Sequence, residues 1–345
     1  MSRQVQILVK FFEKNVINVN ETQILKITFS PSPNSYAFVN GIEIVSTPAN
    51  LYIRGDEYDI KMVGRQNIFY SINNNTALRT WYRLNVGGNL VPSTGDTGMY
   101  RVWDSDDAFV VGYSYLPALL DVNITYTSET PTYTAPTIVY TTSRTIAYNN
   151  RSLDWIFPLD SGFYYLFRLH FCEIQLEFTK INQRVFDIFI GNQMADRQFD
   201  VIEWSRGWRI PVYRDYAVYV RDPDGRRSKQ NMSLELRPNM ETKPVYENAI
   251  LNGLEIFKLS DPNGNLATPY PESLLERPKK TPSNNKKKNI SSHIIVVIIT
   301  SVISGIVVFS ILGFLISWRR NGGKLVLVRK RQAHHHYHLI CAGTF

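Results

Sequence analysis

His170, Cys172 and Glu173 are the residues of this chain whose types and close spacing could do chemistry. On a β-strand, His170 and Cys172 would project from the same face, where they could bind zinc or act together in nucleophilic catalysis. Two ligands without a third do not make a zinc site, and no histidine stands at a recognisable catalytic spacing from the cysteine. The segment therefore predicts no metal site, no cofactor and no catalytic residue.

Carboxylates are grouped at Asp104, Asp106 and Asp107, and again at Asp222 and Asp224. Glycoside hydrolysis needs two carboxyl groups placed across a cleft, and nothing in the sequence indicates such a pair. Aspartate-rich segments are typical of turns. We expect these residues to be structural and the chain not to be an enzyme.

Two further motifs have a simple interpretation. Arg54, Gly55 and Asp56 spell an integrin-binding tripeptide, which we interpret as a solvated turn. The histidines at 334–336 and His338 could hold a metal loosely, but the surrounding tail offers no scaffold for a site. We interpret that run as an accident of sequence.

The formal net charge of +8 is unevenly distributed along the 345 residues. From Arg277 onward there are 12 basic residues and no acidic one, which leaves 26 of the 38 Lys and Arg residues, against all 30 Asp and Glu, for the first 276 positions. The part that can fold is therefore mildly acidic. A basic face for nucleic acid should lie on the folded domain, so this distribution argues against a nucleic-acid partner.

Residues 294–318 form one apolar run without a charged side chain. Twenty-five residues in a helix rise about 37 Å, enough to cross the hydrocarbon core of a bilayer. Buried helices seldom reach this length without a polar stripe. The run therefore predicts one transmembrane helix. Cys172 and Cys341 would then lie in different compartments and could not form a disulfide.

Glycosylation motifs indicate the orientation of this helix, because the basic residues flanking it are equally numerous on both sides. Every Asn-x-Ser/Thr triplet precedes the span, and Asn289 lies too near the bilayer to be a good acceptor. The N-terminal part is therefore expected outside the cell. The first residues contain no apolar run long enough for a secretion signal, so we expect that signal to be missing. The glycosylation candidates are Asn20, Asn74, Asn123, Asn150 and Asn231.

An internal repeat relates residues 23–48 to residues 230–262. Each copy has an alternating strand pattern, a turn marked by proline, and then Asn-Gly-(Ile/Leu)-Glu-Ile, starting at Asn40 and at Asn252. The repeated unit therefore has the length of a domain. Because few residues precede Asn40, we expect the first domain to be represented only by its last strands, with an exposed edge.

The residues from about 80 to 262 read as all-β. Phe163, Tyr165 and Phe167 alternate with other residues at period two, and short apolar alternations recur near 186–190 and 216–220. Such patterns, interrupted by Gly, Pro, Asn and Asp, favour a sandwich or barrel. The Pro-, Asn- and Lys-rich stretch that follows has little to bury and is interpreted as a stalk.

Several motifs of this chain together resemble the malectin-like receptor kinase family of plants, of the FERONIA type. The similarity runs in order from about residue 22 to residue 267. The matching stretches are AFVNGIEIVS at 37–46, RLNVGG at 83–88, WDSDD at 103–107, RLHFCE at 168–173, QRVFDIFI at 183–190 and NAILNGLEI at 248–256.

This resemblance implies an all-β, jelly-roll-like malectin-like sandwich outside the cell, in which RLHFCE is a core strand, and one transmembrane α-helix below it. The family's cytosolic Ser/Thr kinase is not recognisable after Trp318, where no phosphate loop or catalytic loop occurs. The implied divisions are residues 1–48 (remnant of a first malectin-like domain), 49–79 (linker), 80–262 (complete second domain), 263–292 (stalk), 293–318 (membrane helix) and 319–345 (basic cytosolic tail).

The resemblance also implies a function at the plasma membrane. It implies a receptor ectodomain whose ligand is a secreted, basic, Cys-rich peptide of the rapid alkalinisation factor class, bound with a lipid-anchored co-receptor, and in addition or instead pectin or another cell-wall glycan. Two alternatives stay open, a carbohydrate-binding lectin-like membrane module and a non-functional fragment of a receptor kinase gene. No ligand-contacting residue can be assigned at this stage.

Overall fold

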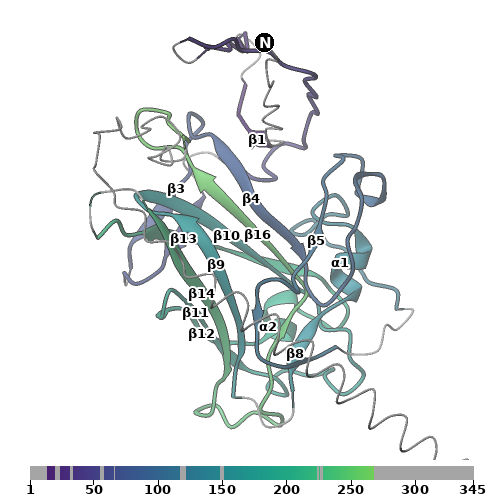
Figure 1. The fold of residues 1–345 in the computed structure, drawn as a ribbon. Coiled ribbons are helices and arrows are strands. Elements are labelled where there is room, and N and C mark those ends of the chain that lie inside the picture. The colour runs from purple at the N-terminus through teal and green to yellow at the C-terminus, as the bar shows by residue number, and fades with distance from the viewer. Residues whose placement is uncertain are drawn as a thin grey trace, which may run out of the picture. The chain divides into compact units, whose positions relative to one another are not determined.

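The regular secondary structure of the described part of the chain consists almost entirely of β-strands (Figure 1). The computed structural model describes residues 14–19, 24–31, 34–54, 58–65, 67–116, 122–147, 151–223, 225 and 228–267. Within these ranges the helices are short: α1 (Thr137–Thr141), α2 (Val201–Ser205) and a 3-10 turn at Ser93–Gly95. The prediction of an all-β fold is confirmed.

The large sheet has eight strands in the order β1-β4-β16-β10-β13-β2-β3, with β5 also beside β4. Its neighbours are antiparallel except at β13–β2 and β4–β5, which are parallel. The strands are β1 (Asn15–Val16), β2 (Asp59–Met62), β3 (Phe69–Ser71), β4 (Leu78–Asn85), β5 (Asp104–Ser105), β10 (Phe163–Phe171), β13 (Val212–Val220) and β16 (Gly253–Leu259).

A five-stranded sheet has the order β12-β11-β14-β9-β6, and a small sheet has the order β15-β8-β7. The hairpin between β11 and β12 turns at Gly191 and Asn192, which both have positive φ, as a tight two-residue hairpin requires. The strands are β6 (Val110–Val111), β7 (Ser114–Tyr115), β8 (Arg144–Ile146), β9 (Leu153–Asp160), β11 (Phe186–Ile190), β12 (Gln193–Phe199), β14 (Lys229–Pro238) and β15 (Ile250–Leu251).

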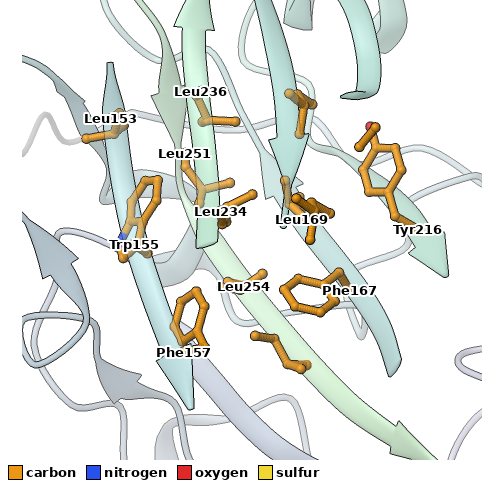
Figure 2. Close-up of a cluster of buried hydrophobic side chains, with 14 of the residues drawn as sticks. Leu153, Trp155, Phe157, Phe167, Leu169, Tyr216, Leu234, Leu236, Leu251 and Leu254 are labelled. Atoms are coloured by element: carbon orange, nitrogen blue, oxygen red, sulfur yellow. The ribbon is translucent and has the colours of Figure 1, made fainter. Parts of the chain in front are cut away.

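The main core lies between the large sheet and the five-stranded sheet. Figure 2 shows side chains from both sheets meeting there, with Trp155, Phe157 and Leu234 on one side and Phe167 and Leu254 on the other. The alternation predicted for Phe163, Tyr165 and Phe167 places their rings in this core, because successive side chains of a strand point to opposite faces.

The opposite face of β10 is also buried, which the alternation did not indicate. Leu166, Arg168 and His170 point away from the main core and are still fully buried. Apolar side chains from loops outside the strands cover this outer face of the large sheet, among them Leu51, Tyr52 and Trp103. Charged residues on β10 are therefore enclosed on the outer face by these loops.

The two copies of the repeat differ in structure. In the second copy β14 pairs with β9 and β11, and β16 pairs with β4 and β10. In the first copy every described residue between 24 and 47 is exposed, and none of them belongs to a strand. Asn40 and Glu43 are thus exposed, whereas their counterparts Asn252 and Glu255 are fully buried.

Residues 49–79, predicted as a linker, contribute to the large sheet. β2 pairs in parallel with β13, β3 pairs with β2, and Leu51 and Ile60 pack in an apolar cluster on the outer face of that sheet. Parallel pairing of this kind joins strands far apart in sequence, which alternation within one segment does not reveal. The limits of the predicted domains stay a prediction.

Residues 268–345 lie outside the described part, and with them the predicted membrane helix, nearly all of the predicted stalk and the predicted cytosolic tail. Among the residues that are described, no helix is long and apolar enough to cross a bilayer.

Candidate ligand-binding cleft

Four charged residues of alternating sign form a row across the centre of the large sheet. Arg83 on β4, Glu255 on β16, Arg168 on β10 and Asp215 on β13 are successive register neighbours. Their side chains are at most 5% exposed. Arg83 Nε lies 2.6 Å from Glu255 Oε1, and Arg168 holds both carboxylate oxygens of Asp215 at 2.8 Å. We call these four residues the buried charged row.

Electrostatics in the row favour the charged forms. Burial alone would raise the pKa of the Glu255 carboxyl, but the charge of Arg83 and a hydrogen bond from His170 outweigh burial and hold that pKa well below its usual range. For Arg168, burial acts against the charge, yet the carboxylates of Asp215 and Glu255 raise the pKa of its guanidinium. Each charge is thus compensated by a cross-strand neighbour.

His170 lies beside the row and is neutral in the folded chain. Its Nε2 is 3.2 Å from Glu255 Oε2, and its Nδ1 is 3.0 Å from the Tyr140 hydroxyl. Because a carboxylate only accepts hydrogen bonds, we assign the ring proton to Nε2 and let the Tyr140 hydroxyl donate to Nδ1. Burial lowers the pKa of His170 and outweighs the nearby carboxylate.

Cys172 and Glu173 have separate surroundings. Burial raises the pKa of the Cys172 thiol, and its backbone N–H donates to Asn252 Oδ1 at 2.8 Å. Glu173 Oε2 accepts from Arg184 at 2.5 Å in a second buried ion pair. Within the described ranges no group of three or more His, Cys, Asp and Glu side chains could hold a metal.

The aspartates singled out in the sequence differ in burial and in their partners. Asp106 is buried and accepts hydrogen bonds from Arg144 Nε at 2.6 Å, Trp155 Nε1 at 2.8 Å and the Gly87 N–H at 2.9 Å. Asp107 is exposed and pairs with the same arginine. Asp106 therefore fastens a loop to the sandwich. Asp224 lies outside the described residues.

The buried charged row also fixes the loop of residues 49–54 on the sheet. Arg168 donates to the backbone carbonyl of Leu51 at 2.6 Å. The Tyr52 hydroxyl donates to Glu255 Oε1 at 2.9 Å, and Arg101 donates to that hydroxyl at 3.0 Å. Leu51 and Tyr52 are only 3% and 4% exposed. The loop that begins the predicted linker is therefore anchored, and Arg54 follows this anchor directly.

An open cleft of about 530 Å³ lies next to this loop. Its described walls come from three distant parts of the chain: residues 49–54 with Tyr58, residues 128–134, and α2 together with the start of β13. This volume is in the usual range for ligand sites. The lining side chains that carry rings or charge are Arg54, Tyr58, Glu129, Tyr133, Trp204, Tyr213 and Arg214.

Guanidinium groups lie against the rings of this cleft. The Arg54 guanidinium carbon is 4.4 Å from the Tyr58 ring centroid and 5.4 Å from that of Tyr213. The Arg214 guanidinium is 3.8 Å from the Trp204 ring, against which Phe199 also stacks. The rings therefore hold the two arginines in place by cation–π contacts, and the arginines are among the polar groups that line the cleft.

These cleft residues escaped the sequence analysis. Arg54 belongs to the tripeptide interpreted as a turn, and the other two residues of that tripeptide lie outside the described part. Trp204, Tyr213 and Arg214 belong to no recognised motif. The available signal was the density of Trp, Tyr and Arg between residues 204 and 214, in a segment without strand alternation.

The glycosylation candidates can be located in part. Asn74, Asn123 and Asn231 are exposed, the last on the outer face of β14. Asn20 and Asn150 lie outside the described residues.

Comparison with known proteins identifies relatives of this chain. The family model for the malectin-like domain matches residues 2–259. The receptor-like protein kinase FERONIA of Arabidopsis thaliana is 45% identical over 267 residues, which are 74% of this chain and 29% of FERONIA. The receptor-like protein kinase ANXUR2 of the same plant is 37% identical over 268 residues, 73% of this chain and 30% of ANXUR2.

Solved structures of plant receptor-like kinases are also similar to this chain. The crystal structure of the plant peptide RALF23 in complex with FER and LLG2 matches at 42% identity and a TM-score of 0.58, over 66% of this chain and 60% of that one. The ANX1 ectodomain from Arabidopsis thaliana matches at 35% identity and a TM-score of 0.57, over 62% and 56%. The chain spans about 30% of the length of the two curated relatives named above.

Replacing Asp215 by Asn should lower the free energy of unfolding by about 3 kcal/mol, because Arg168 would stay buried without its carboxylate partner. Chemical denaturation followed by tryptophan fluorescence measures this loss. The matched control is Glu235→Gln, which removes a more exposed pair with Arg237 and should cost at most about 1 kcal/mol. Equal losses in the two variants would contradict a structural role for the row.

Acid should destabilise the chain through His170. Burial lowers the folded-state pKa of His170 below its ordinary value of 6.5, so the unfolded state takes up a proton first as the pH falls. The contribution of His170 to stability is therefore present above about pH 6.5 and is lost below it, by at most about 1.4 kcal/mol per pH unit. His170→Gln should flatten the free energy of unfolding measured between about pH 7 and pH 5. An unchanged slope would contradict a buried neutral histidine.

Proposed function

Because this chain belongs to the malectin-like domain family, we propose that it is the ligand-binding ectodomain of a plasma-membrane receptor of the receptor-like kinase type. The observation that carries this proposal is its similarity to FER in the crystal structure with RALF23 and LLG2. The matched region is the malectin-like ectodomain of these relatives. The proposed role is binding and not catalysis. Glu255, which lies beside His170, and Glu173, which follows Cys172, are both engaged in buried ion pairs with arginines.

The proposed ligand is a secreted, basic, Cys-rich peptide of the rapid alkalinisation factor class, bound together with a lipid-anchored co-receptor. The peptide RALF23 and LLG2 are the partners of FER in the solved complex. The acidic balance of the first 276 residues supports attraction of a basic peptide. Kinase signalling is proposed only for the longer receptor type, of which this chain spans a part.

The proposed location is the plasma membrane, with one span at residues 293–318 and the N-terminal part outside the cell. The apolar run and the exclusive placement of glycosylation motifs before it support this topology. Exposure of Asn74, Asn123 and Asn231 keeps these acceptors accessible. We further propose that residues 24–47 belong to a first malectin-like domain, since they repeat the pattern of β14 and β16.

A cell-wall glycan such as pectin is a second proposed partner, favoured by the aromatic lining of the cleft. Sugars commonly stack on free aromatic faces. In this cleft, however, the rings of Tyr58, Tyr213 and Trp204 are in contact with guanidinium groups. The cleft therefore supports a lectin-like role less well than the family similarity supports a peptide receptor.

Expression of the full chain behind an added secretion signal in plant cells tests the topology. Asn74→Gln, Asn123→Gln and Asn231→Gln should each remove one glycan, seen as a step in gel mobility that disappears after enzymatic deglycosylation. Asn89→Gln is the control, since Asn89 is exposed but lies in no Asn-x-Ser/Thr triplet. A chain without glycans whose N-terminal part resists external protease would refute the proposed orientation.

Calorimetric titration tests the ligand. The purified chain with the lipid-anchored co-receptor should bind a synthetic rapid alkalinisation factor peptide saturably, and the affinity should fall as salt is raised, because salt screens charge attraction. A control peptide with glutamine at its Lys and Arg positions should bind at least about tenfold more weakly. Equal binding of both peptides, or of neither, would argue against this function.

A further inference from the structure

An asparagine followed by glycine occurs three times in the part of the chain that the structure describes, at Asn40, Asn252 and Asn263. Such a pair is chemically labile, because the backbone nitrogen of the glycine can attack the side-chain amide and close a five-membered ring, and glycine has no Cβ to hinder the approach. Ring closure needs an amide and a backbone that are free to rotate. The three pairs differ in this freedom.

Asn252 is fully buried, and its side-chain amide is held at both ends. Its Oδ1 accepts from the Cys172 N–H at 2.8 Å, and its Nδ2 donates to the carbonyl oxygens of Tyr140 and Thr142 at 3.1 and 2.8 Å. The next residue, Gly253, begins β16 and is tightly enclosed, since a Cβ there would lie 2.5 Å from a neighbouring side chain. Ring closure would have to break buried hydrogen bonds, so this pair is protected.

Asn263 is exposed but lies in a hydrogen-bonded turn. The Gly264 N–H donates to the backbone carbonyl of Asp261 at 2.8 Å. Asp261 Oδ1 also accepts from the backbone N–H groups of Asn263 and Asn265, at 3.0 and 2.8 Å. The nitrogen that would attack is therefore engaged, and the backbone around it is restrained by the turn.

Asn40 has neither kind of restraint. It lies at a bend of the backbone, and both Asn40 and Gly41 are exposed. Among the described residues, no hydrogen bond holds the Asn40 amide or the Gly41 N–H. A Cβ on Gly41 would meet nothing within 4 Å beyond its chain neighbours. The attacking nitrogen and the amide are thus free to meet in water.

We propose that Asn40 is a site of spontaneous deamidation. The Gly41 nitrogen loses its proton to solvent and forms a bond to Asn40 Cγ, and the Cγ–Nδ2 bond breaks as ammonia leaves. Water then opens the resulting succinimide. Opening at Cγ gives aspartate, and opening at the main-chain carbonyl of residue 40 gives isoaspartate, whose backbone runs through the side chain. One water is taken up and one ammonia is released, and no oxidant, reductant or cofactor takes part.

The modification would make the two copies of the repeat chemically different at equivalent positions. In the second copy, Asn252 donates to two carbonyl oxygens, whereas an ionised aspartate only accepts hydrogen bonds. A deamidated Asn40 therefore cannot form the contacts of Asn252. Conversely, strand partners that buried Asn40 as Asn252 is buried would stop the reaction, so its rate also reports whether residues 24–47 are paired.

Peptide mapping by mass spectrometry tests the proposal on the full purified chain, incubated at mildly alkaline pH to favour loss of the proton from the attacking nitrogen. Asn40 should convert to aspartate and isoaspartate at least about tenfold faster than Asn252, because breaking the buried hydrogen bonds of Asn252 adds to its barrier. Asn263 should convert at an intermediate rate.

Gly41→Ala is the decisive variant. Alanine fits at this position, because its Cβ meets open space and Gly41 is not among the residues with positive φ. The added methyl group hinders the attacking nitrogen, so conversion of Asn40 should slow by about tenfold or more. Ile42→Ala is the matched control: it changes an exposed residue of the same segment but leaves the Asn-Gly pair intact, and the rate should stay the same.

Denaturant separates the effect of structure from that of sequence. Asn40 and Asn252 both precede Gly-(Ile/Leu)-Glu-Ile, so their rates should become equal in the unfolded chain. Equal rates in the folded chain, a difference that persists in denaturant, or an unchanged rate in Gly41→Ala would each overturn the proposal. None of these measurements involves a ligand, so their outcome is independent of the proposed receptor function.

Discussion

The pairing of four buried charges across β4, β16, β10 and β13 is the interaction on which this structure depends. Burying four charged groups costs several kcal/mol per ion unless each meets an opposite charge in good geometry. The alternation Arg83, Glu255, Arg168, Asp215 meets that condition only in one register, because a slip of one residue would turn each side chain to the other face. The row therefore specifies how the four central strands align.

The same row connects the sheet to the segment that precedes it. Arg168 and Glu255 bind the backbone of Leu51 and the hydroxyl of Tyr52, so a segment without regular structure becomes a fixed wall. β2 then adds to the edge of the sheet beside β13. The cleft lies where this wall meets the start of β13, and the Tyr213 ring that contacts Arg54 also contacts Arg168 of the row.

The sequence revealed the parts of this arrangement better than their assembly. Alternation located β10 and β11, because period two is a property of each strand alone. The motifs that carry the family resemblance contain Arg83, Arg168 and Glu255. Their pairing depends on the register between distant strands, because Arg83 is 172 residues from Glu255 in the chain and Arg168 is 47 residues from Asp215. The first repeat makes the same point: Glu43 has the motif of Glu255 but is exposed, since no strand of the described structure pairs beside it.

The cleft was harder to predict for a related reason. Its residues come from loops and from the ends of α2 and β13, where no periodic pattern constrains side-chain type. In a sandwich the paired strands restrict substitution, whereas loops on a rigid scaffold can vary and carry function. The buried row and the cleft therefore face different constraints: Arg168 and Asp215 must be kept for the strands to align, while Arg54 and Arg214 can change without disturbing the row. Ligand preference can thus change at the cleft on an unchanged sandwich.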